Sequence, residues 1–171
     1  DPRNPKRLGT IPDAPCGLFV RGKLPEEEKP AVAIVGARDC TTYGRNLSQW
    51  FGGELAAAGV QILSGMARGI DAYSHYGALK KGGATFAVLA GGADMCYPES
   101  NRDIYMELEQ RGGIISECPP GVRPLKYYFP LRNRILSGMS DLVLIIEARE
   151  KSGSLITADY GLEQGKEVYA A

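Results

Sequence analysis

The sequence predicts an α/β protein with a doubly wound, mostly parallel β-sheet and helices on both faces of that sheet. Three observations favour this class. Short aliphatic and β-branched runs recur along the chain, and most are continuously apolar, as in strands that are buried on both faces. Segments with apolar residues at helical spacing separate these runs. Strands and helices therefore alternate, which is typical of a doubly wound sheet.

The expected elements follow one another in a regular order. The first strand is expected in LFVRG (18–22), ahead of the alternation. The other strands, most of them continuously apolar, are expected in AVAIVG (31–36), VQILSG (60–65), TFAVLA (85–90), GIISE (113–117), DLVLIIEA (141–148) and EVYAA (167–171). Helices are expected over residues 43–58, 70–81, 100–111 and 157–164. Pro130 suits the first position of a further helix.

The helix over residues 43–58 illustrates how these segments are predicted. Gly59 suits its end, just as Lys80 and Lys81 suit the end of the following helix. The apolar positions that define its expected buried face are Leu47, Trp50, Phe51, Leu55 and Ala58.

The composition indicates one folded domain without a membrane span. The chain has 171 residues, 44% of them apolar, which is enough for one core. Lys plus Arg equals Asp plus Glu at 20 each, which argues against a protein that binds polyanions over its whole surface. No apolar run approaches about 18 residues and no signal peptide is visible, so we expect a cytoplasmic protein. The chain begins with Asp1 and ends within an expected strand, which favours a fragment of a longer protein.

Residues 1–30 differ from the rest, because six of the eleven prolines lie there. We therefore expect a proline-rich N-terminal arm (1–30) that packs on the sheet of a Rossmann-like domain formed by residues 31–171.

The cysteines are widely spaced and lack a C-x-x-C motif, which fits reduced thiols rather than a zinc site or a disulfide framework. They are Cys16, Cys40, Cys96 and Cys118.

Four loops at the expected carboxyl edge of the sheet combine glycine with serine, threonine or arginine. Ligands of open parallel sheets bind beyond this edge, where helix N-termini point. The loops are GARDCTTYG (36–44), SGMARGID (64–71), AGGADMCYPESN (90–101) and EAREKSGSLITA (147–158). Gly36 permits a close turn, Arg38 supplies a fixed charge, and Ser152, Gly153 and Ser154 lead into a helix. Any such fold needs glycine in these turns, but their coincidence at one edge favours an anion site.

The segment from Cys118 to Ser140 is basic and aromatic. Its 23 residues contain no acid. They include the cations Arg123, Lys126, Arg132 and Arg134 and the rings Tyr127, Tyr128 and Phe129. Cations meet phosphates and rings stack on unpaired bases, so the segment indicates a single-stranded nucleic-acid surface; the alternative is a solvated loop whose tyrosines pack inward. Arg132 and Arg134 lie about 200° apart around a helix, so we expect one of them to form a structural ion pair.

The sequence lacks the motifs of common nucleotide enzymes, namely G-x-G-x-x-G, a Walker lysine and G-x-S-x-G. Asp71 and His75 are spaced as a pair of metal ligands without a third. The alternative function is a nucleotide-binding or nucleotide-processing Rossmann-like enzyme of the phosphoribohydrolase type. Such enzymes carry a P-G-G-x-G-T loop with a nearby glutamate, whereas this chain has GGAD at 91–94. We therefore expect no enzymatic activity, no metal and no cofactor.

Five long motifs resemble the central domain of the DprA/Smf family of bacterial DNA-processing proteins. They are IVGARDCTTYG (34–44), SGMARGIDAYSHYGAL (64–79), TFAVLAGGADMCYPESN (85–101), FPLRNRILSG (129–138) and SGSLITADYGLEQGKEV (152–168). LGTIPDAPCGLFVRG (8–22) resembles the segment that precedes this domain in the family. The resemblance implies an extended Rossmann fold and a non-enzymatic protein that binds and protects single-stranded DNA. It also implies a homodimer that helps to load the RecA recombinase in natural transformation.

Carried over residue by residue, the resemblance implies a set of DNA-binding positions. Arg38, Lys126 and Phe129 match family positions that contact single-stranded DNA, and Gly65, Arg68 and Gly69 match a family loop in the same pocket. With the loop residues and the FPLRNR motif, the candidate set is Gly36, Arg38, Gly65, Arg68, Gly69, Lys126, Phe129, Arg132, Asn133, Arg134, Ser152, Gly153 and Ser154.

The sequence also departs from the family pattern. Neither the family's helical N-terminal domain nor its C-terminal winged-helix domain matches these residues, and the family often continues with V-P-G where this chain has Ala170 and Ala171. Family dimer contacts are expected near this end. A third hypothesis, a protein–protein adaptor, is disfavoured by the basic and aromatic segment.

Overall fold

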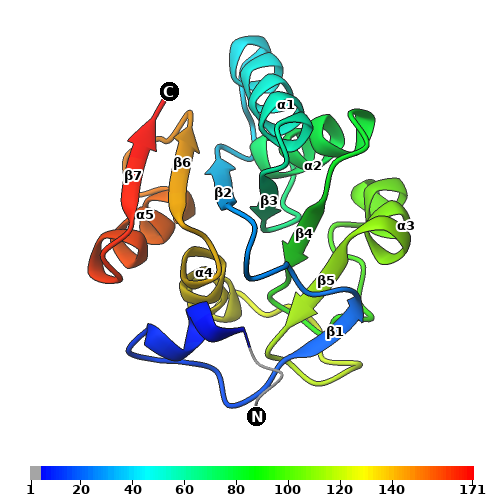
Figure 1. Cartoon of the computed structure of the whole chain (residues 1–171), viewed down its shortest axis with the longest axis vertical. Coiled ribbons are helices and arrows are strands. Elements are labelled where there is room, and N and C mark those ends of the chain that lie inside the picture. The colour runs from blue at the N-terminus through cyan, green and yellow to red at the C-terminus, as the bar shows by residue number, and fades with distance from the viewer. Residues whose placement is uncertain (1–4) are drawn as a thin grey trace.

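The computed structural model describes residues 5–171, which form a seven-stranded sheet covered by helices (Figure 1). The strands are β1 (Phe19–Gly22), β2 (Ala31–Gly36), β3 (Gln61–Ser64), β4 (Thr85–Val88), β5 (Gly113–Ser116), β6 (Leu142–Ile146) and β7 (Glu167–Ala170). The helices are α1 (Thr42–Ala57), α2 (Ile70–Lys80), α3 (Arg102–Arg111), α4 (Tyr128–Gly138) and α5 (Gly153–Glu163), with short 3-10 helices η1 (Lys6–Thr10) and η2 (Glu99–Asn101). Within residues 5–171, no helix has the length and apolar character that crossing a membrane requires.

The sheet is doubly wound, as the sequence predicts. Its strand order is β1-β5-β4-β3-β2-β6-β7, and only β1 is antiparallel to its neighbour. Val32 and Ile34 pack with α1 and α2 on one face, while Ala33 and Val35 pack with α4 and α5 on the other. The central runs are largely apolar because nearly every position of these strands is buried on one face or the other. This confirms the predicted fold class.

The prediction for the buried face of α1 was wrong in part. Trp50 is 57% exposed, whereas Gly52 is buried against α2. A Cβ atom at Gly52 would lie 2.3 Å from the carbonyl oxygen of Ser74, so the two helix backbones approach each other closely. Large side chains cannot enter this contact. They lie at its margins, where Leu47 and Phe51 pack partly against the core.

Two helices begin earlier than predicted. Helix α4 starts at Tyr128, so Pro130 occupies the third position rather than the first. Its missing N–H is tolerated there because the first turn of a helix has no intrahelical acceptors. Helix α5 starts at Gly153 instead of residue 157, after Ser152 at its N-cap. Its first turn has a loop-like composition, which hides it from pattern analysis.

The N-terminal segment packs against the rest of the chain. Strand β1 pairs with β5, and Leu8 and Ile11 belong to the core cluster that includes α4 and α5. Residues 1–4 of the expected arm lie outside the described residues. The division of the chain at residue 30 stays a prediction.

The order of the strands determines where a ligand site is expected. The chain runs from β2 through β3 and β4 to β5, and then returns to place β6 on the other side of β2. The direction of winding therefore reverses between β2 and β6, where Gly36 pairs with Ile146. In open α/β sheets, the crevice beyond the strand ends at such a reversal is the usual ligand site.

Candidate functional site

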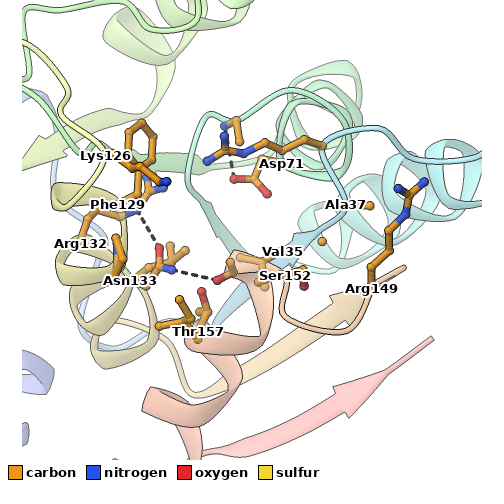
Figure 2. Close-up of a pocket in the computed structure, with 18 of the residues that line it drawn as sticks. Val35, Ala37, Asp71, Lys126, Phe129, Arg132, Asn133, Arg149, Ser152 and Thr157 are labelled. Atoms are coloured by element: carbon orange, nitrogen blue, oxygen red, sulfur yellow. Dashed lines mark hydrogen bonds between the residues drawn. The ribbon is translucent and has the colours of Figure 1, made fainter.

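A cavity of about 660 Å³ lies at this reversal (Figure 2). The loops after β2 and β6 and the first turns of α4 and α5 form its walls. The candidate residues that line it are Gly36, Arg38, Lys126, Phe129, Arg132, Asn133, Ser152, Gly153 and Ser154. The fold thus brings most of the predicted site together from segments that are far apart in the sequence.

The half-buried ring of Phe129 is surrounded by cations and one aromatic neighbour. The guanidinium carbon of Arg38 lies 5.2 Å from the ring centroid, and that of Arg132 lies 5.9 Å from it. Tyr97 packs edge-on, with 6.1 Å between the two ring centroids. In Figure 2, Lys126 lies beside Phe129, and Arg149 lies across the cavity from both. A ring in this position can stack on a base while the cations meet the phosphates.

Arg132 holds the cavity together from inside. Its side chain is buried, and Nη1 donates to the carbonyl oxygen of Gly65 at 2.8 Å and to that of Val88. Its Nε donates to Asn133 Oδ1 at 3.0 Å, and Asn133 Nδ2 donates to the carbonyl oxygen of Gly153 at 3.2 Å (Figure 2). These bonds tie α4 to β4, to the loop after β3 and to the start of α5. They fix the relative positions of the walls.

Asp71 provides the buried countercharge. Its Oδ2 accepts from the backbone N–H of Gly65 at 3.0 Å and of Ala67 at 3.3 Å. Burial raises the pKa of the Asp71 carboxyl, and the charge of Arg132 opposes this shift. Burial likewise lowers the pKa of Arg132 to about 10, so it stays charged at neutral pH. A Cβ atom at Gly65 would lie 2.7 Å from both side chains, so this candidate residue makes room for the pair beneath the cavity.

Asp71 and His75 do not act as a pair. His75 is fully buried, and its Nδ1 lies 2.7 Å from Thr85 Oγ1. Among residues 5–171, no three His, Cys, Asp or Glu side chains are grouped so that they could hold a metal ion.

Arg134 faces away from the cavity. Its Nη2 contacts both carboxylate oxygens of Glu117 at 2.8 and 2.9 Å, and its Nε donates to the carbonyl oxygen of Asp13 at 2.9 Å. The expectation that one of the two arginines forms a structural ion pair is confirmed, and Arg134 is that residue. Its place among the candidate site residues is therefore corrected: Arg134 supports α4 and does not line the site.

Arg68 and Gly69 also lie outside this cavity, because they line an adjacent one. Gly69 has a φ of 76°, and a Cβ atom there would lie 2.2 Å from the carbonyl oxygen of Ala37. It therefore lets the loops after β2 and β3 touch.

Sequence analysis missed Tyr97 and Arg149, which line the first cavity. Both lie in loops that follow parallel strands, and that position was the available signal.

The exposed charged residues that line the site are three cations and one acid, Asp39. Within residues 5–171, the side chains of Arg38, Lys126 and Arg149 form no ion pair. Glu147, by contrast, is occupied: it accepts from the backbone N–H of Thr41 at 2.8 Å and from its hydroxyl, and these bonds lower the pKa of the Glu147 carboxyl. Its backbone is left-handed, with a φ of 52°, which is uncommon for a residue with a side chain. Glu147 is thus bound at the start of α1, and the three cations stay accessible.

Known proteins share both the sequence and the fold. Residues 1–171 match the family model described as DNA recombination-mediator protein A. The chain is 42% identical over 164 residues to DNA processing protein DprA of Bacillus subtilis (strain 168), covering 95% of this chain and 55% of that protein. It aligns with the X-ray structure of DNA processing protein A from Streptococcus pneumoniae at a TM-score of 0.90 and 39% identity, over 97% of this chain and 58% of that one.

A second solved structure is equally similar in fold. DNA processing protein A from Helicobacter pylori, whose structure describes its single-stranded DNA binding mode, aligns at a TM-score of 0.90 and 33% identity, over 97% of this chain and 76% of that one. The chain spans about half the length of the curated relatives it matches. The ligands and partners of those longer proteins are therefore only proposals for this chain.

Proposed function

The chain belongs to the DNA recombination-mediator protein A family, and from this premise we propose that its cavity between β2 and β6 binds single-stranded DNA. One observation carries the proposal. The half-buried ring of Phe129 lies in the cavity wall with the exposed Arg38 5.2 Å from its centroid and Lys126 lining the same cavity. A flat apolar surface next to unpaired cations fits a ligand that is both aromatic and anionic.

The proposed contacts divide according to chemistry. Arg38, Lys126 and Arg149 meet phosphate oxygens, because they are charged, exposed and free of ion pairs within residues 5–171. Phe129 stacks on an unpaired base. The first turn of α5 lines the cavity through Gly153, so the positive end of that helix adds to the attraction for phosphate. Duplex DNA hides the base faces that this arrangement needs. The Helicobacter relative, a single-stranded DNA binder, supports the proposal.

The wider role that we propose follows the family. The bound strand is protected and passed to a RecA recombinase during natural transformation, by a homodimer in the cytoplasm. RecA, the dimer and the location stay predictions. We also propose that the chain is not an enzyme, because the alternative nucleotide-processing class needs a P-G-G-x-G-T loop that the sequence lacks. Release of free base from a nucleoside monophosphate, or of phosphate from ATP, would support that alternative instead.

The test compares single and double strands on the same protein. Labelled oligo-dT and a duplex of equal length are titrated over a series of salt concentrations, with the wild type and with Arg38→Ala. We expect tighter binding of the single strand. We also expect Arg38→Ala to reduce the log–log salt slope by about 0.7, the value for one phosphate contact on a single strand. Equal affinity for both forms contradicts the stacking contact. An unchanged slope with a lower melting temperature makes Arg38 structural.

A further inference from the structure

A second cavity, of about 670 Å³, adjoins the first. It lies between α1, α2 and the start of α3, and the loop after β2 separates it from the first cavity. Arg38 and Asp39 line both cavities. The two cavities therefore share this loop as a wall, and a chain-like ligand in the first reaches the second by crossing over the loop.

The walls of the second cavity combine arginine with tyrosine. Arg45 from α1, Arg68 from the loop after β3, and Tyr73 and Tyr76 from α2 line it. Tyr73 and Tyr76 are three residues apart, which places them on one face of the helix. The Arg45 guanidinium carbon lies 4.8 Å from the Tyr73 ring centroid, and the Tyr73 side chain is half-buried. Tyr76 is 46% exposed, with Lys80 Nζ 6.0 Å from its ring centroid, and is the more exposed of the two rings.

The charge of this cavity is concentrated and unpaired. Arg38, Arg45 and Arg68 face it together with one acid, Asp39. In the described part of the chain, none of these arginines forms an ion pair, whereas Arg102 and Arg111 on neighbouring α3 are paired with Glu99 and Glu107. The chain has no net charge, so this grouping is local. A local excess of positive charge in a hollow attracts an anionic ligand.

We infer that the second cavity continues the binding site for a single DNA strand, a statement that rests on the function proposed above. The strand runs from Phe129 past Arg38 to Tyr76. Arg45 and Arg68 meet its phosphates, and Tyr76 stacks on a base. The carboxylate of Asp39 disfavours a phosphate at the junction, so the phosphates lie on either side of it. The cavity adds affinity only for strands long enough to reach it.

The experiment is a length series. Oligo-dT strands from about 4 to 16 nucleotides, the range that one single-strand-binding fold covers, are titrated against the full chain at several salt concentrations. The shortest strands are expected to bind Arg45→Ala and Arg68→Ala as they bind the wild type. For the longest strands, each variant is expected to lower the log–log salt slope by about 0.7. Tyr76→Ala is expected to weaken long-strand binding about thirtyfold, the middle of the range for one stacked base, while Tyr76→Phe retains it.

The controls separate this proposal from the one above. Arg111→Ala removes an arginine outside both cavities and is expected to leave binding unchanged at every length. Arg45 and Arg68 are exposed, so their truncation is expected to leave the melting temperature unchanged. If their variants bind long strands like the wild type while Arg38→Ala binds weakly, the second cavity is not a DNA site and the first remains one. If the wild type shows no preference for single strands, both proposals fail.

Discussion

Basic residues at the two edges of the sheet behave differently. At the amino edge, Arg7 donates to the carbonyl oxygens of Glu27 at 3.2 Å and Lys29 at 2.9 Å, and it lies 3.2 Å from the carboxylate of Asp141. At the carboxyl edge, Arg38 and Lys126 form no ion pair with any described residue. The residue types are the same, and their partners differ. A cation with a protein partner stabilises the fold, whereas an unpaired cation that lines the cavity is available to a ligand.

Arg132 tests this comparison most severely, because it lies at the carboxyl edge but has protein partners. In Arg132→Ala, Asp71 stays buried without its countercharge, and the carbonyl oxygens of Gly65 and Val88 lose a donor. We expect the free energy of unfolding to fall by about 3–5 kcal/mol, measured by urea denaturation. Adding Asp71→Asn should recover part of the loss. A variant as stable as the wild type would mean that Arg132 belongs with the free cations.

His75 makes the amino edge sensitive to acid, because it packs there against Thr85 at the start of β4. Burial lowers the pKa of His75 from 6.5 to about 3, so the unfolded chain binds its proton more readily than the folded one. The stabilising effect is complete above pH 6.5 and is lost as the pH falls toward 3. Near pH 5 we expect a loss of about 2 kcal/mol from this group, at about 1.4 kcal/mol per pH unit.

Urea denaturation as a function of pH checks this expectation. His75→Gln is the matched variant, because it removes the titrating ring and keeps a polar side chain. The raised pKa of Asp71 acts in the opposite direction, since a carboxyl that binds its proton more tightly in the folded than in the unfolded chain gains stability as the pH falls. Its effect is common to both proteins. Parallel stability curves for the wild type and His75→Gln between pH 5 and 6.5 would contradict the assignment.

Phe129 extends the comparison from folding stability to DNA affinity. Phe129→Ala is expected to cost about 1–3 kcal/mol of single-strand affinity with little change in salt slope, because a ring neutralises no phosphate. Phe129→Tyr keeps the ring and should bind normally, whereas Phe129→Leu keeps much of the packing and should not. If Phe129→Ala instead lowers the free energy of unfolding by about 3–5 kcal/mol and leaves binding intact, the ring is core packing.

The strands of the sheet could be predicted from the sequence because the residues of each strand themselves indicate it. Each expected strand in residues 18–171 is present. The continuous apolar runs report the burial of the central strands, whereas the edge strands β1 and β7 are largely exposed. The buried face of α1 was predicted incorrectly because its packing is set by a close approach to α2 at Gly52, which apolar spacing does not reveal. The start of α5 was missed for a similar reason: Gly153 resembles a loop residue when considered alone.

The candidate site was predictable as a group of loops, but not residue by residue. The carboxyl-edge rule placed Arg38 and Ser152 together correctly. Helix geometry required Arg132 and Arg134 to face apart, yet the choice between them depended on Glu117, which lies far away in the sequence. Arg68 was assigned to the first cavity because a resemblance in sequence does not show that the loop after β2 divides the surface in two. Partners distant in the sequence decide such roles.

The smallest expected effect comes from a matched pair of lysines, one at each edge. Lys126 lines the cavity at the carboxyl edge, whereas Lys23 follows β1 and its backbone N–H donates to the carbonyl oxygen of Gly112 at 2.9 Å, at the amino edge. Both side chains are exposed, so neither truncation should change the melting temperature. Lys126→Ala is expected to lower the log–log salt slope of single-strand binding by about 0.7, and Lys23→Ala to leave it unchanged. Equal slopes for the two variants would show that the chain attracts DNA through its overall surface, and the distinction between the two edges would then be wrong.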